Sequence, residues 1–118
     1  MPKSHNDLLH HILDDANFLI NESDFLTEGD FIQDEKSKRA FARSIEIIGE
    51  ASKQIPVEVK EAYPDVEWKA MARMRDRLIH HYFGVDYGLV WDTIQENIPL
   101  LKEQVTQIIE AESGSEGH

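Results

Sequence analysis

The 118-residue chain contains no cysteine, which excludes disulfides, thiolate metal sites and a cysteine nucleophile. Proline and glycine are scarce, at four and six residues, and no apolar run approaches the about 18 residues that a membrane span needs. The N-terminus also lacks the basic-then-apolar layout of a signal peptide. The length predicts a single domain, and these absences predict a soluble, cytoplasmic protein with no membrane association.

Basic residues are outnumbered, with 12 Lys and Arg against 23 Asp and Glu, a net charge of −11. Such a charge argues against a nucleic-acid binder, because binding phosphates needs Lys and Arg. The charge is unevenly distributed, however: residues 1–34 carry −7 and residues 83–118 carry −6, whereas residues 35–55 and 66–82 each carry +2. Acidic ends therefore flank two weakly basic internal segments.

Apolar residues recur at spacings of three and four along most of the chain, which is typical of amphipathic helices. The pattern predicts an all-α protein, a four- to five-helix bundle formed by residues 1–112, followed by a flexible polar tail at 113–118. A short helical turn is expected between Pro56 and Pro64. The four main helices are expected at about 5–22, 30–55, 66–82 and 87–111.

Several residues predict where these helices begin, bend or pack. Ser4, Asp65 and Asp86 are expected as N-caps of the first, third and fourth helices. Pro99 is expected to kink the last helix, because it removes a backbone donor and clashes with the preceding turn. Gly49 lies beside the apolar stripe of the second helix, where a small residue lets another backbone come close. That stripe consists of Phe41, Ile45, Ile48, Ser52 and Ile55.

Motifs of several enzyme classes are absent from the sequence. There is no Gly-rich phosphate loop, His-Glu-x-x-His motif or Gly-x-Ser-x-Gly elbow. His5, His10 and His11 lie near acidic residues at helical spacing, which can hold a metal when two such helices face each other. No Glu-x-x-His pair accompanies them, so these histidines are expected to be solvated and no metal site is predicted.

The segment from Arg73 to Tyr82 is the densest polar stretch, with three guanidiniums, a carboxylate, two imidazoles and a phenol within ten residues. Arg75 follows the apolar stripe of its helix, so its charge is expected to be paired or to face a cleft. Arg75 and Tyr82 lie on nearly the same face of an ideal helix, whereas Arg75 and His80 diverge by about 140°. The two groups can act on one ligand only if the helix deforms, the Arg75 stem bends, or two chains meet.

A histidine beside arginines is sufficient to cleave RNA without a metal. The imidazole can take the 2′-hydroxyl proton or protonate the leaving oxygen, and the guanidinium can hold the phosphate. The alternative is structural: Arg75 and Asp76 bridge neighbouring residues, while His80, His81 and Tyr82 cap a packed helix. Composition and spacing alone favour this structural interpretation.

Several motifs in order resemble one known family. The pattern Arg-x4-His-x-Tyr at residues 75–82 is similar to that of HepT-like proteins, the DUF86 branch of the HEPN superfamily, and the resemblance covers about residues 6–108. Unlike many family members, which have Asn after the motif arginine, this chain has Asp76. The other matching segments are Asp34-Glu-Lys36, Glu46-Ile-Ile-Gly-Glu-Ala51, Tyr82-Phe-Gly-Val-Asp86, Val90-Trp91 and Asn97-Ile-Pro-Leu-Leu-Lys102.

The resemblance implies a homodimer in which the motif helices line a shared cleft, and a metal-independent RNase toxin of a type VII toxin–antitoxin pair. Arg75 and His80 would be the catalytic pair. Tyr82 would accept AMP from an MNT-type nucleotidyltransferase antitoxin, which uses ATP and thereby silences the toxin; the toxin itself needs no cofactor. Residues expected to support the site are Asp76, Arg77, His81 and Glu50.

Two other interpretations remain open at this point. Asp76 and the acidic total are compatible with a non-catalytic nucleotide-binding or docking subunit of a nucleotidyltransferase complex. A purely structural helical dimer would place no ligand on the motif at all. The acidic segments also suit a protein partner with a basic surface, because opposite charges steer association.

Overall fold

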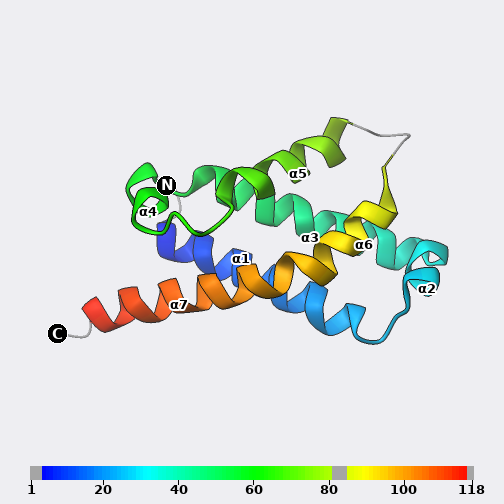
Figure 1. The fold of residues 1–118 in the computed structure, drawn as a ribbon, viewed down its shortest axis with the longest axis horizontal. Helices are drawn as coiled ribbons and strands as arrows, with labels where there is room; N and C mark the ends of the chain where they lie inside the picture. Colours follow the sequence, from blue (N-terminus) through cyan, green and yellow to red (C-terminus); the bar gives the residue numbers. More distant parts are fainter. Residues whose placement is uncertain (1–3, 81–84, 117–118) are drawn as a thin grey trace.

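The computed structural model describes residues 4–80 and 85–116, and within them the only regular secondary structure is α-helix, without strands (Figure 1). The predicted all-α class is confirmed. The seven helices in the described ranges are α1 (His5–Ser23), α2 (Glu28–Gln33), α3 (Glu35–Gln54), α4 (Val57–Ala62), α5 (Trp68–His80), α6 (Tyr87–Glu96) and α7 (Ile98–Glu116).

Long helices α1, α3, α5 and α7 form an elongated bundle of about 50 × 29 × 26 Å. Helix α3 lies between α1 and α5 and packs along both, while α7 packs along α1. Helices α6 and α7 follow one another along one arm of the bundle, and short α2 and α4 lie toward its two ends (Figure 1). Helix α5 thus packs mainly against α3, so the α3–α5 contact determines where the side chains of α5 are positioned.

Two of the predicted N-caps are confirmed. The Ser4 side chain accepts a hydrogen bond from the backbone N–H of Asp7 at 3.2 Å, and Asp86 accepts one from Leu89 at 3.0 Å. Each cap satisfies one of the backbone donors that the first helical turn leaves unpaired.

The prediction of one helix over 30–55 is wrong, because Asp34 ends α2 and starts α3. Asp34 has an extended backbone (φ −102°, ψ 103°), and its carboxylate accepts from the backbone N–H of Lys36 and the hydroxyl of Ser37. Helix α2 begins earlier than expected, at a capping box in which Thr27 and Asp30 exchange hydrogen bonds. The apolar stripe alone gave no sign of this break.

Predictions at Asp65 and Pro99 are also wrong. Asp65 lies in a turn, with its carbonyl accepting from Gln104 Nε2 at 3.1 Å, and α5 starts three residues later at Trp68. The last arm breaks at Asn97 instead of bending within one helix, so Pro99 lies in the first turn of α7, where a missing N–H costs no hydrogen bond. Helix α7 reaches Glu116, beyond the predicted end at 111; the flexibility of residues 113–118 stays a prediction.

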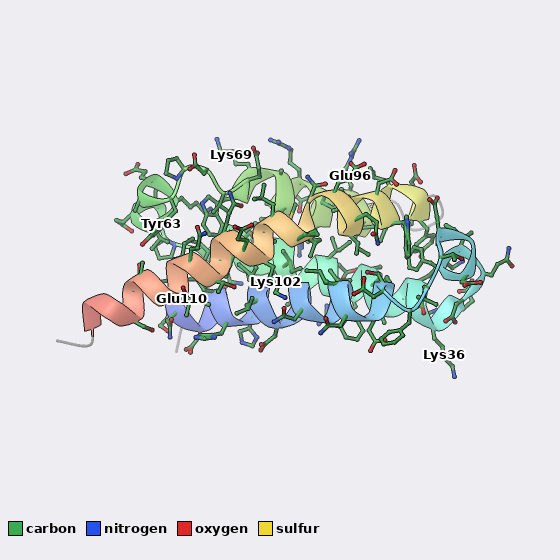
Figure 2. The ribbon with its side chains drawn as sticks, turned by 60° about the horizontal axis from the view of Figure 1, so that its bottom comes forward. Lys36, Tyr63, Lys69, Glu96, Lys102 and Glu110 are labelled. Atoms are coloured by element: carbon green, nitrogen blue, oxygen red, sulfur yellow. The ribbon has the colours of Figure 1, made fainter. Side chains whose placement is uncertain are left out.

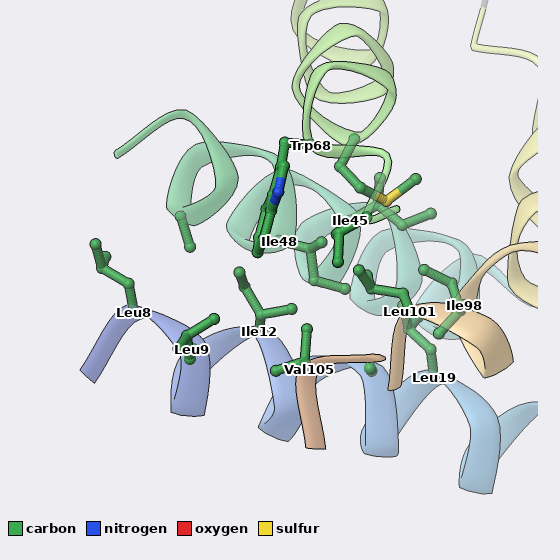
Figure 3. Packing of buried hydrophobic residues seen from close by; sticks show 14 of the residues in the cluster. Leu8, Leu9, Ile12, Leu19, Ile45, Ile48, Trp68, Ile98, Leu101 and Val105 are labelled. Carbon is green, nitrogen blue, oxygen red and sulfur yellow. The ribbon is translucent and has the colours of Figure 1, made fainter. Parts of the chain in front are cut away.

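The core is built by the predicted stripes of α1, α3 and the α6–α7 arm, with α5 closing one end (Figure 3). All five stripe residues of α3 are at most 3% exposed. Trp68 of α5 points into this core beside Ile48, and its indole N–H donates to the carbonyl of Tyr63 at 3.2 Å. The N-terminal turn of α5 is therefore anchored both by burial and by a hydrogen bond.

Charged side chains project outward around this core, as Lys36, Lys69 and Glu96 illustrate in Figure 2. Among the described helices, none combines the length and the hydropathy that crossing a bilayer requires.

Candidate functional site

Helices α3 and α5 approach most closely at Gly49. A Cβ atom on this buried glycine would clash with the Cβ of Arg75 and would lie 2.7 Å from the carbonyl oxygen of Met71. Real Cβ atoms do not come so near to a backbone oxygen, so this crossing requires glycine. The predicted close approach at Gly49 is confirmed, and the residue that fills the vacated space is Arg75.

Arg75 is held by carboxylates from both helices. Its Nη2 lies 3.1 Å from Glu50 Oε2 on α3, and its Nη1 donates to Asp76 Oδ1 at 3.1 Å. The Arg75 side chain is 25% exposed, so it is not fully enclosed between the two helices. The expectation that a charge on the apolar stripe is paired is confirmed, and Glu50 and Asp76 are its partners.

A second cation, Lys53, shares the Asp76 carboxylate. Lys53 Nζ lies 3.5 Å from Asp76 Oδ1, the oxygen that also accepts from Arg75. The hydrogen bond from Arg75, assisted by the positive charge of Lys53, lowers the pKa of Asp76 below its ordinary value. Asp76 is therefore ionised at neutral pH and balances two positive charges from two helices.

Sequence reasoning missed Lys53, although a signal was present. Five charged residues of α3 recur at steps of 4, 3, 4 and 3, so they share one face of the helix. We call this face the charged stripe, and it runs parallel to the apolar stripe on the other side of α3. Its members are Arg39, Arg43, Glu46, Glu50 and Lys53.

Of the remaining motif residues, the structure describes only some. His80 is the last described residue of α5, and its side chain lies outside the described part of the chain, as do His81 and Tyr82 altogether. Arg77 is exposed. The structure thus brings Arg75, Asp76 and Glu50 together, and the positions of the His80 imidazole and the Tyr82 phenol relative to them stay predictions.

Two surface hollows flank the C-terminal half of α5. A hollow of about 330 Å³ lies between α3 and α5, where Arg39, Arg43 and Leu78 line it together with Tyr87. A smaller one, of about 180 Å³, lies between α5 and α6 and includes Arg77. Arginines therefore line both sides of the segment that carries the motif.

The histidines near the N-terminus do not form a metal site in the described residues, where no group of three potential ligands occurs. His10 and His11 are exposed, as expected. His5 differs from the expectation, because its Nε2 lies 2.7 Å from Glu112 Oε2 and the two half-buried side chains join α1 to α7.

Comparison with known proteins places this site in a family context. Residues 9–108 match the family described as ribonuclease HepT-like. No solved structure matches the chain significantly.

Three relatives are similar to this chain over most of their length. A protein of Caldanaerobacter subterraneus subsp. tengcongensis, named as a candidate RNase, is 48% identical over 104 residues, covering 88% of this chain and 93% of the relative. A Thermococcus cleftensis protein named as a probable ribonuclease HepT is 45% identical over 102 residues, covering 86% and 93%. A candidate RNase of Methanocaldococcus jannaschii is 39% identical over 108 residues, covering 92% and 89%. With the family match and these relatives together, the chain belongs to the HepT-like ribonuclease family.

Proposed function

We propose that this protein is a cytoplasmic endoribonuclease, the toxin of a type VII toxin–antitoxin pair, which cleaves RNA through Arg75 and His80. The observation that carries the proposal is the guanidinium of Arg75, fixed at the α3–α5 crossing and still partly exposed, in a chain of the HepT-like ribonuclease family. A fixed and partly exposed cation suits the binding of a phosphodiester.

The chemistry needs neither metal nor cofactor. His80 of the same protomer, or His80 of a second protomer, takes the proton of the ribose 2′-hydroxyl. The 2′-oxygen then attacks the adjacent phosphorus. The bond from phosphorus to the 5′-oxygen breaks, a proton passes to that oxygen, and a 2′,3′-cyclic phosphate remains. Arg75 stabilises the negative charge that grows on the non-bridging oxygens.

A homodimer would resolve the geometry of the pair. Arg75 and His80 are five residues apart on α5, which separates them by about 140° around an ideal helix. If the α5 helices of two protomers face each other across a cleft, Arg75 of one protomer and His80 of its partner can reach the same phosphate. A monomer would require distortion of α5 instead.

Silencing of the toxin would act on Tyr82, two residues beyond the described end of α5. In the proposed reaction the Tyr82 phenol oxygen attacks the α-phosphorus of ATP on an MNT-type nucleotidyltransferase antitoxin, pyrophosphate leaves, and AMP remains on the tyrosine. The added phosphate is negatively charged and would compete with RNA for Arg75. The acidic segments at both ends of the chain suit a partner with a basic surface.

The test of catalysis compares the wild-type protein, Arg75→Ala and His80→Ala on RNA in the presence of EDTA, each purified without its partner. Loss of the phosphate clamp or of the general base should lower cleavage about 100-fold or more. Circular dichroism checks that the variants fold. Cleavage that survives both substitutions in folded protein would exclude this motif as the catalytic site.

Intact-mass measurement tests the modification. Protein made together with the antitoxin should gain mass in whole AMP units, and Tyr82→Phe should abolish the gain. An unchanged wild-type mass in the presence of active antitoxin would rule out AMP transfer.

A second function is favoured by one observation, the occupation of Arg75 by two carboxylates. In this alternative the protein is a non-catalytic subunit that docks on the nucleotidyltransferase and holds a nucleotide. Unmodified protein that binds nucleotide but leaves RNA intact would favour it.

A further inference from the structure

Two cations from different helices converge on one oxygen atom at the α3–α5 crossing. Asp76 Oδ1 lies 3.1 Å from Arg75 Nη1 and 3.5 Å from Lys53 Nζ. This is the arrangement by which proteins hold a non-bridging phosphate oxygen, with a guanidinium on one side and an ammonium on the other. Here a carboxylate of the same chain takes that position.

We propose that Lys53 and Arg75 together form the binding site for a phosphodiester oxygen of RNA, and that Asp76 occupies this site in the free protein. The inference rests on the proposed ribonuclease function, because it assigns the substrate phosphate to the Arg75 guanidinium. It adds Lys53 as a second phosphate ligand and makes Asp76 a competitor of the substrate.

The accessibility of the three side chains supports an exchange of ligands. Arg75 is 25% exposed, and Lys53 and Asp76 are each 43% exposed, so a phosphate can reach the cations without moving a helix. Side chains at such exposure bind each other weakly, because water and salt screen them. Asp76 can therefore swing aside at little cost when a phosphate arrives.

Glu50 has a different part in this arrangement. It contacts Nη2 of Arg75, whereas Asp76 contacts Nη1. A guanidinium presents five donors in a rigid plane, so Glu50 can keep its contact while Nη1 exchanges Asp76 for a phosphate oxygen. Glu50 is itself 48% exposed, but it lies at the other terminal nitrogen and would not compete for Nη1, so we assign it as a positioning residue that orients Arg75 from α3.

Competition between Asp76 and the RNA phosphate predicts opposite effects on RNA affinity for substitutions of Asp76 and Lys53. Asp76→Asn keeps the size of the side chain but removes the charge, so RNA should bind about two- to five-fold more tightly. Lys53→Gln removes one cation of the site and should weaken binding by a similar factor, in the wild-type protein and in the Asp76→Asn background alike.

The experiment measures binding of a 2′-O-methyl RNA, which cannot be cleaved, by fluorescence anisotropy at constant salt. Asp92→Asn on α6 is the matched control, because it removes one exposed carboxylate and changes the net charge equally. Its affinity should stay close to that of the wild type. Thermal unfolding confirms that all variants are folded.

Tighter binding by Asp76→Asn than by Asp92→Asn, together with weaker binding by Lys53→Gln, supports the site. Equal affinities for the two asparagine variants, weaker binding by Asp76→Asn, unaltered binding by Lys53→Gln, or no RNA binding by any protein would overturn it. Parallel cleavage assays on ordinary RNA separate the two proposals: binding that responds as expected without any cleavage would refute the nuclease and leave the phosphate site standing.

Discussion

Helix α3 has two stripes with the same spacing and opposite chemistry. The apolar stripe begins at Phe41 and the charged stripe at Arg39, and each continues in steps of 4, 3, 4 and 3. The apolar stripe is buried against α1 and the α6–α7 arm, while the charged stripe reaches the surface beside α5. One helix therefore supplies the core on one face and the candidate site on the other, which predicts that substitutions on the two faces have separable effects.

The largest loss of stability is expected from Phe41→Ala on the apolar stripe. Phe41 is 2% exposed and stacks on Phe31 with ring centroids 5.0 Å apart. Removing the ring should lower the free energy of unfolding by about 3–5 kcal/mol, measured by urea denaturation. Arg43→Ala on the charged stripe is the control and should change it by no more than about 0.5 kcal/mol. Similar losses for both variants would contradict the division of α3 into two faces.

Gly49→Ala should have the next largest effect, because Gly49 lies where the two helices touch. Alanine improves helix propensity by about 1 kcal/mol, yet its methyl group would clash with Arg75 and Met71. We expect a net destabilisation of about 1–3 kcal/mol together with lower RNA cleavage, since Arg75 must move. Gly29→Ala is the control: a Cβ there meets only Thr27 Oγ1, at 3.9 Å, so its stability should not fall.

Glu50→Gln should separate positioning from folding. Glutamine keeps the size of the side chain but removes the negative charge that pairs with the Arg75 guanidinium at 3.1 Å. RNA cleavage should fall about three- to ten-fold with little change in the unfolding midpoint. Kinetics that show a fall in kcat with an unchanged KM would fit misplacement of the guanidinium. A variant as active as the wild type would remove Glu50 from the site.

Asp15→Asn should have the smallest effect, and it stabilises. Burial raises the pKa of Asp15 above its ordinary value of 3.8, against the opposing hydrogen bond of Ser44. A raised pKa in the folded state favours the protonated form, so ionised Asp15 lowers stability at neutral pH and ceases to do so as the pH falls toward 3.8. Asparagine should raise Tm by about 1–2 °C at pH 7, and the gain should vanish near pH 3.5 in a thermal scan.

Much of the fold could be predicted because the relevant signals are local. Hydrophobic spacing located the four main helical regions, and Ser4 and Asp86 were predictable caps since their partners lie three residues away. The break at Asp34 was missed because the apolar stripe of α3 begins only at Phe41, and the break at Asn97 was missed because the stripe from Val90 to Ile108 continues across it. There the backbone leaves the helix while the side chains keep facing the core.

The site was predictable in composition and less so in geometry. The motif identified Arg75, and the expectation that its charge is paired followed from its place on an apolar stripe. Lys53 was missed, because its relation to Asp76 depends on how closely α3 and α5 approach across 23 residues of chain. That distance is set by Gly49, a residue whose influence comes from the side chain it lacks.

The contact between His5 and Glu112 indicates that the helices could be joined in a different order by circular permutation. These residues lie near opposite ends of the sequence, yet their side chains are 2.7 Å apart, so a short flexible linker could join the two ends of the domain. The junction at Asn97 lies exposed between two complete helices and offers a place to open the resulting loop. A circular permutant that starts at Ile98 would keep α3 and α5 on one uninterrupted stretch of chain. Its new ends would lie at the junction of α6 and α7, away from Arg75 in the sequence.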